Sequence, residues 1–130
     1  KEKRKVTEKF MEFIKSGQNY SKKDFIKEIN NHPIYINLFD EFFSSSNVDL
    51  LITPAVYGTA PKIGAKEIDD LSLFWTYLHV PSLTAPIAKD SSEMPISLNF
   101  VSPKNTDKTL LEFVKTNLYE LILNIKVDNF

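Results

Sequence analysis

The sequence predicts an α/β fold in which helices flank a mixed β-sheet, and three observations lead to this fold class. Three short apolar runs, at residues 48–54, 82–87 and 96–101, have the length and residue types of strands. Segments with apolar residues at helical spacing surround these runs. The chain has 130 residues, of which 42% are hydrophobic and 25% charged, which is typical of one globular domain spanning residues 1–130.

The N-terminal third of the chain is predicted to be helical. Apolar residues recur at helical spacing between residues 3 and 16, and Gly17 stands where a left-handed cap would end this helix. Ser21 precedes Asp24 by three residues, close to a capping box, so a second helix is expected to start there. Pro33 lacks the backbone N–H that a helix interior uses, so we expect a kink or a fresh start after it. The continuing apolar stripe is formed by Leu38, Phe39, Phe42 and Phe43.

The middle of the chain is predicted to hold a loop and a short helix. Residues 55–69 contain Gly and Pro, and they indicate a long ordered loop of the kind that is often functional. Residues 71–79 are apolar on every side, so we expect a helix that is packed on several sides. The crossover from the first strand to the second predicts that these two strands lie side by side and parallel. The short link at residues 88–94 favours an antiparallel hairpin between the second and third strands, which makes the sheet mixed.

A last helix is predicted to begin after Thr106, whose hydroxyl can cap the first turn. Its continuous apolar stripe is formed by Leu110, Val114, Leu118, Leu121, Ile122 and Ile125. The sequence shows no internal repeat, low-complexity tract or interdomain linker, in line with one domain.

The composition excludes several kinds of site and partner. The chain has no cysteine, which excludes disulfides, thiolate ligands and cysteine nucleophiles. Because it has only two histidines, we do not expect a zinc site. Sixteen basic and seventeen acidic residues give a net charge of -1, without the basic surface that nucleic-acid binding requires. No apolar run approaches the roughly 20 residues of a membrane span. We therefore expect a cytoplasmic protein with no cofactor, no metal, no nucleic-acid partner and no membrane partner.

Three motifs in the second half of the chain resemble those of the amidase signature family. Residues 49–54 and 60–64 resemble the pattern D-x-L-(L/V)-x-T-P followed by A-P-x-I-G. Residues 74–86 resemble x-W-(T/N)-x-x-G-x-P-(A/S)-L-(S/N)-x-P, and residues 94–103 resemble L-P-(V/I)-G-(L/V)-Q-L-V-G-P. The order and spacing are those of the family, and the likeness extends over nearly the whole chain. This resemblance implies the C-terminal part of an amidase domain, whose fold is α/β/α.

The chain departs from these patterns at several glycines. His79 stands where the family usually has Gly, and no Gly precedes Met94. Ser97 and Ser102 replace glycines of the third motif. We expect the backbone at these positions to avoid positive φ angles, because a side chain is strained there. The departures favour the amidohydrolase branch of the family over the amidotransferase branch.

The resemblance implies an enzyme that hydrolyses carboxylic amide C–N bonds with a Ser-Ser-Lys triad. No residue of this chain matches that region, so no catalytic residue is assigned, and the chain alone is expected to be inactive. The triad would come from an N-terminal part of the same enzyme. The serine runs at residues 44–46 and 91–92 lack flanking glycines and are interpreted as structural. A Ser-His-Asp scheme built on His32 or His79, with Asp69 or Asp70, is not favoured, since order and spacing do not identify such triads.

Four residues are candidates for contact with a small-molecule amide substrate. Thr53 and Pro54 end the first strand, whose last residues turn out into a loop, and we expect function just past this point. Trp75 and Thr76 lie on the helix facing the loop after Pro54 and would line one wall of an acyl or amide pocket, although Trp75 also fits a core position.

The alternative to an enzyme segment is a stand-alone, non-catalytic domain that derives from this family and binds a partner. It would do so through the surface that a catalytic N-terminal part otherwise covers. Open strand edges also favour self-association into a homo-oligomer.

Overall fold

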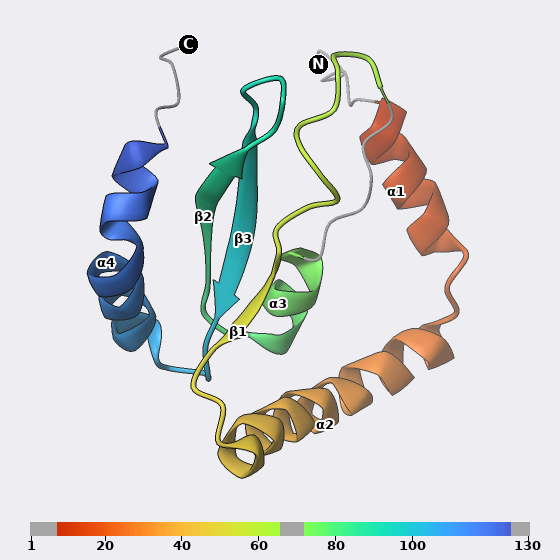
Figure 1. Ribbon diagram of the computed structural model, residues 1–130. Helices are drawn as coiled ribbons and strands as arrows, with labels where there is room; N and C mark the ends of the chain where they lie inside the picture. Colours follow the sequence, from red (N-terminus) through yellow and green to blue (C-terminus); the bar gives the residue numbers. More distant parts are fainter. Residues whose placement is uncertain (1–7, 66–71, 126–130) are drawn as a thin grey trace, which may run out of the picture. The chain divides into compact units, whose positions relative to one another are not determined.

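The computed structural model describes residues 8–65 and 72–125, and Figure 1 shows how the elements follow one another. The elements are α1 (Glu8–Gln18), α2 (Lys22–Ser46), β1 (Leu51–Pro54), α3 (Ser72–Leu78), β2 (Ser82–Lys89), β3 (Pro95–Val101) and α4 (Asp107–Asn124). The chain divides into two compact units, residues 1–35 and residues 36–130, and the boundary falls within α2. The α/β class, with helices flanking a sheet, is confirmed.

The first unit contains α1, which ends differently from the prediction. Gly17 lies inside α1 and does not adopt a positive φ angle, so its predicted role as a left-handed cap is wrong. The last turn closes instead through backbone bonds, in which Asn19 donates to Ser16 at 3.1 Å and Tyr20 donates to Gly17 at 3.2 Å. The predicted start of this helix, at residues 3–7, lies outside the described residues.

The start of α2 confirms the predicted cap. The Ser21 hydroxyl accepts a hydrogen bond from the Asp24 backbone N–H at 3.1 Å and donates one to the Asp24 carboxylate at 2.6 Å. The predicted fresh start after Pro33 is not observed, because α2 continues through this residue to Ser46. A helix can continue through a proline because the residue removes only its own N–H hydrogen bond, while the neighbouring turns can still form theirs.

The three strands of the second unit form a sheet in the order β1, β3, β2, with both pairs antiparallel (Figure 1). The predicted β2–β3 hairpin is confirmed. The predicted parallel pairing of β1 with β2 is wrong, because β3 lies between them, and the sheet of the described residues is antiparallel rather than mixed. The last three residues of β3 are buried. Because β3 is the central strand, its backbone groups can form hydrogen bonds with a neighbouring strand on each side.

One face of the sheet packs against α4, which Figure 1 shows beside β2. The buried core of this face consists of Ala85, Phe100, Leu110 and Val114. Thr106 stands at the N-cap of α4 as predicted, but its hydroxyl makes no cap hydrogen bond. It donates to the Pro103 carbonyl and lies 2.8 Å from the Ser102 hydroxyl, and these nearer partners replace the expected cap.

The opposite face of the sheet carries α3. Trp75 and Leu78 are buried against Val101 of β3, with Leu51 of β1 packed beside them. The predicted packing of α3 on several sides is wrong within the described residues, because Leu73 is 73% exposed. Phe74 and Tyr77 are exposed as well. The described residues therefore cover only one side of this short helix.

Candidate functional site

The site predicted from the sequence combines the end of β1 with the middle of α3. Thr53 and Pro54 are the last two residues of β1, and Trp75 and Thr76 lie in α3. Alternate residues of a strand point to the same face of the sheet, so Thr53 shares its face with Leu51. Leu51 packs against the cluster that contains Trp75. The fold therefore places Thr53 and Trp75 on the same face of the sheet.

Thr53 and Trp75 share a second property, which concerns their polar atoms. The hydroxyl oxygen of Thr53 and the indole Nε1 of Trp75 are buried, and neither has a hydrogen-bond partner among the described residues. Leaving a buried polar group without a partner costs about 1–3 kcal/mol, so such groups are rare in folded proteins. The two positions therefore leave one N–H donor and one hydroxyl, which can donate and accept, unused beneath the residues that cover them.

The packing around Trp75 is that of a core residue. Its side chain is 6% exposed, and its ring centroid lies 6.1 Å from that of Phe39 and 5.1 Å from that of Phe74. The core and pocket interpretations of Trp75 involve different parts of its side chain. The six-membered ring contributes apolar area to the core, whereas the Nε1–H is the atom that a polar ligand would use.

The other two candidates occupy more accessible positions. Pro54 is exposed at the end of β1. Thr76 is also exposed, and its hydroxyl donates to the Ser72 carbonyl at 3.1 Å, one turn earlier in α3. This bond directs the Thr76 hydroxyl to its own helix backbone, which is a common arrangement for a threonine within a helix.

A polar row across the sheet adds a residue that the sequence interpretation missed. Thr53 of β1 and Thr84 of β2 both lie opposite Asn99 of β3. Asn99 is 2% exposed, and its side-chain oxygen accepts a hydrogen bond from the Thr84 hydroxyl. The available signal was the alternation in β3, where Ser97 and Asn99 place polar side chains on one face of a strand that is covered on both faces.

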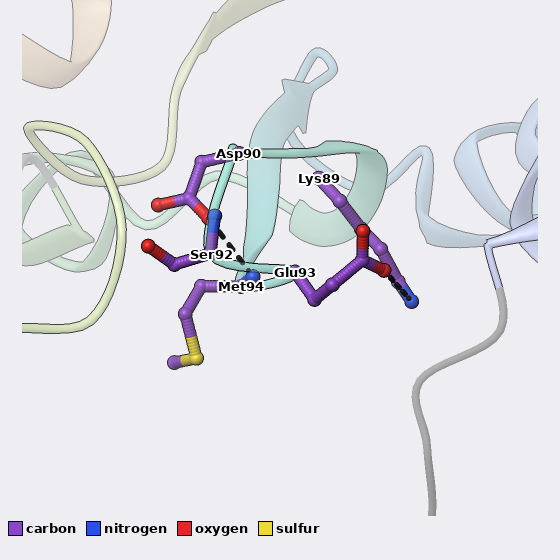
Figure 2. A network of polar contacts seen from close by, with 5 residues as sticks. All are labelled: Lys89, Asp90, Ser92, Glu93 and Met94. Carbon is purple, nitrogen blue, oxygen red and sulfur yellow. Dashed lines mark hydrogen bonds and ion pairs between the residues drawn. The ribbon is translucent and has the colours of Figure 1, made fainter.

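The loop after Pro54 is attached to the β2–β3 hairpin by Asp90. One carboxylate oxygen of Asp90 accepts hydrogen bonds from the backbone N–H of Met94 at 3.0 Å and of Ser92 at 2.8 Å. Figure 2 shows this turn, together with the ion pair at 2.9 Å between Lys89 and Glu93. The other carboxylate oxygen accepts from the Thr59 hydroxyl at 3.1 Å.

These hydrogen bonds change the acidity of Asp90. The bond from the Met94 backbone has the largest effect, followed by that from Ser92, and both lower the pKa of Asp90 from its ordinary value of 3.8. Partial burial opposes this change, and the Thr59 hydroxyl adds to it. The hydrogen bonds favour the ionised form because a carboxylate is the better acceptor.

The expected avoidance of positive φ angles is wrong at two positions. His79, at the usual glycine of the second motif, has a φ of 56°, and Glu93, which precedes Met94, has a φ of 62°. Ser97 and Ser102 do not have positive φ. The fold thus keeps a left-handed conformation at His79 although this chain has a side chain there, since the backbone must turn sharply between α3 and β2.

A hollow of about 620 Å³ lies elsewhere in the second unit, where the end of α2, residues 48–50 and the start of α4 meet. Phe43, Leu110 and Phe113 form apolar parts of its wall, and Asp40 and Asp49 form acidic parts. None of the four predicted substrate-binding residues lines it. The hollow and the predicted site are therefore separate features of this unit.

The serine run at the end of α2 is bonded to its own helix. The hydroxyls of Ser44 and Ser45 donate to backbone carbonyls of Asp40 and Glu41 within α2, at 2.9 and 2.7 Å. Residues 69–70 lie outside the described residues.

Within residues 8–65 and 72–125, no three His, Asp or Glu side chains form a group that could hold a metal ion. No helix among them is long and apolar enough to cross a membrane.

Comparison with known proteins gives two matches. The sequence matches the model of the Amidase family over residues 2–111. A solved structure titled "Crystal structure of amidase" has a similar fold, with a TM-score of 0.76 at 22% sequence identity. This likeness covers 89% of the present chain and 29% of the solved chain, so the present chain spans less than a third of that structure. No curated protein matches the sequence.

Proposed function

The chain belongs to the amidase family, and from this premise we propose that it is the C-terminal segment of a hydrolase acting on carboxylic amide C–N bonds. In this proposal the chain contributes sheet core and one wall of the substrate cleft. A Ser-Ser-Lys triad comes from an N-terminal part of the same enzyme and not from these 130 residues. The observation that carries the proposal is the fold likeness, which covers 89% of this chain but 29% of the solved amidase.

The proposed wall consists of Thr53, Pro54, Trp75 and Thr76. The buried hydroxyl of Thr53 and the indole N–H of Trp75 support this assignment, because both lack partners among the described residues. A carboxamide carries an acceptor C=O and a donor N–H, and this pair matches an indole donor and a hydroxyl acceptor. Exposed Pro54 and Thr76 would contribute contact area at the rim.

The proposed N-terminal part would cover surfaces that the described chain leaves open. Leu73, Phe74 and Tyr77 form an exposed apolar side of α3. The outer edges of β1 and β2 are also unpaired in the described sheet, and open edges readily pair with further strands. A cytoplasmic location and assembly into homo-oligomers stay predictions from the sequence.

One observation favours the alternative of a stand-alone binding domain. Trp75 and Leu78 are already buried by residues of the same unit, so the α3 face has a core without a further segment. In this alternative the exposed side of α3 would bind a partner protein, and no substrate would contact Trp75.

The coding sequence upstream of Lys1 and the activity of its complete product test the proposal. We expect an upstream Ser within a Gly-Ser-rich loop, an earlier Lys, and turnover of a chromogenic anilide that is lost when this Ser is replaced by Ala. The 130-residue chain alone should give no turnover and no labelling by a fluorophosphonate probe. A complete product without these upstream residues, or probe labelling of the chain alone, would overturn it.

A further inference from the structure

The loop that follows the proposed substrate wall is attached to the sheet at two points. Ala55, directly after Pro54, is buried, and its backbone N–H donates to the Ser97 carbonyl of β3 at 3.1 Å. Four residues later, the Thr59 hydroxyl donates to the Asp90 carboxylate at 3.1 Å, a contact between residues 31 positions apart. Both attachments therefore fix the loop to β3 or to its hairpin.

The residues between these attachments are apolar and accessible. Val56 and Tyr57 are 44% and 67% exposed, although they stand between two anchored positions. The backbone turns at Gly58, whose φ is 90° and whose N–H donates to the Val56 carbonyl at 3.0 Å. Positive φ favours glycine, so this tight turn is encoded locally. The loop thus presents two apolar side chains beside the end of β1.

We propose that Asp90 is a positioning residue that acts through Thr59 and holds Val56 and Tyr57 as an apolar rim of the substrate cleft, for contact with the acyl part of an amide. This inference rests on the proposed function for the identity of the ligand, but the latch between Asp90 and Thr59 does not. One oxygen of the Asp90 carboxylate is itself held by the backbone N–H groups of Ser92 and Met94, which orients the carboxylate so that its other oxygen accepts from Thr59. Preorganised contacts of this kind lower the conformational cost of binding a ligand.

Two substitutions separate the latch from the turn that supports it. Thr59→Val keeps the shape of the side chain and removes only the donor to Asp90. Thr59→Ser keeps the donor and should restore the latch. Ser92→Ala is the matched control, because the Ser92 backbone N–H, rather than its side chain, donates to Asp90.

Hydrogen exchange on the 130-residue chain tests the latch without any need for activity. We expect Thr59→Val to speed exchange of the hydrogen-bonded loop amides of Ala55 and Gly58 by roughly 2- to 10-fold, the effect of one lost hydrogen bond, with the Ser92 and Met94 amides unchanged. Thr59→Ser and Ser92→Ala should exchange like the parent chain. Unchanged loop exchange in Thr59→Val, or an equal increase in the hairpin amides, would overturn the latch.

The rim itself is tested in the complete enzyme with a short and a long acyl amide. Thr59→Val should raise KM for the long acyl amide several-fold with kcat little changed, and Thr59→Ser should restore it. The same KM in parent and Thr59→Val enzymes would overturn the rim while leaving amide hydrolysis established. An inert complete product with a confirmed latch would instead reject the proposed function and with it the rim.

Discussion

The hydroxyl of Thr84 donates a hydrogen bond to the side-chain oxygen of Asn99 across the β2–β3 pair. Thr53 lies opposite the same asparagine on β1, yet its buried hydroxyl has no partner among the described residues. We therefore expect Thr53→Val to raise the free energy of unfolding of the chain by about 1 kcal/mol, because valine removes the orphan group at nearly constant shape. Urea denaturation measures the effect.

The matched control for this change is Thr84→Val, which should lower the free energy of unfolding by about 1–3 kcal/mol because it leaves the buried oxygen of Asn99 without its donor. A loss of stability in Thr53→Val as large as that in Thr84→Val would contradict the account. It would mean that the Thr53 hydroxyl has a partner within the chain.

His79 holds a left-handed backbone conformation that favours glycine, with a φ of 56°. The strain of roughly 1–2 kcal/mol exceeds the entropic cost of glycine, about 0.5–1 kcal/mol, so His79→Gly should stabilise the chain by up to about 1 kcal/mol. Ser97→Gly, in β3 at another family glycine, should destabilise it by about 0.5–1 kcal/mol, since Ser97 does not have a positive φ. Thermal unfolding of both variants decides; a fall in Tm for both would refute the strain at His79.

The lowered pKa of Asp90 predicts a defined pH dependence. Because the folded pKa lies below the ordinary value of 3.8, the ionised carboxylate stabilises the fold, and this contribution is complete above the unfolded pKa. It is lost as the pH falls through the folded pKa. Urea unfolding at pH values falling from about pH 6 into the acid range should therefore show Asp90→Asn less stable than the parent at pH 6, with a difference that becomes smaller as the pH falls below the ordinary pKa of 3.8. A difference that stays constant over this range would show that ionisation of Asp90 does not contribute.

The exposed apolar side of α3 predicts that the isolated chain self-associates. Phe74 is 51% exposed and Leu73 is 73% exposed, and contiguous apolar patches are uncommon on monomers. We expect light scattering to show concentration-dependent association that Leu73→Glu reduces. Lys108→Glu, at an exposed position of α4, provides a charge-change control that should leave association unaltered. A monodisperse parent chain at high concentration would instead support the stand-alone domain.

Local chemistry made some features of the fold predictable. The cap of Ser21 on Asp24 depends on residues three positions apart, so the sequence pattern was sufficient to identify it. The same reasoning failed at Thr106, since the nearer Pro103 carbonyl takes its hydroxyl. The order of the strands in the sheet was not predicted correctly. The crossover pattern specified which segments are strands, but the burial of β3 between β1 and β2 depends on the whole sheet.

The candidate site was predictable only in part, for a similar reason. Thr53 and Trp75 follow from the motifs, whereas the orphaned state of their polar atoms depends on packing that no motif encodes. Asn99 was overlooked because a polar residue in an alternating strand is expected to face solvent, whereas here it lies in the central strand and is 2% exposed. The contact between Asp90 and Thr59 joins two loops whose pairing the sequence does not indicate.

The central claim, that Trp75 forms part of a substrate wall in an amide hydrolase, is tested most directly by substrate preference in the complete enzyme. Trp75→Ala should cost about 3–5 kcal/mol of stability and should also change the ratio of kcat/KM between short and long acyl amides. Leu78→Ala is the matched control, because Leu78 is buried in the same cluster and is not a predicted contact. We expect it to lower Tm and leave the ratio unchanged. If both variants lower Tm and neither changes the ratio, Trp75 is a core residue and the proposed wall is wrong.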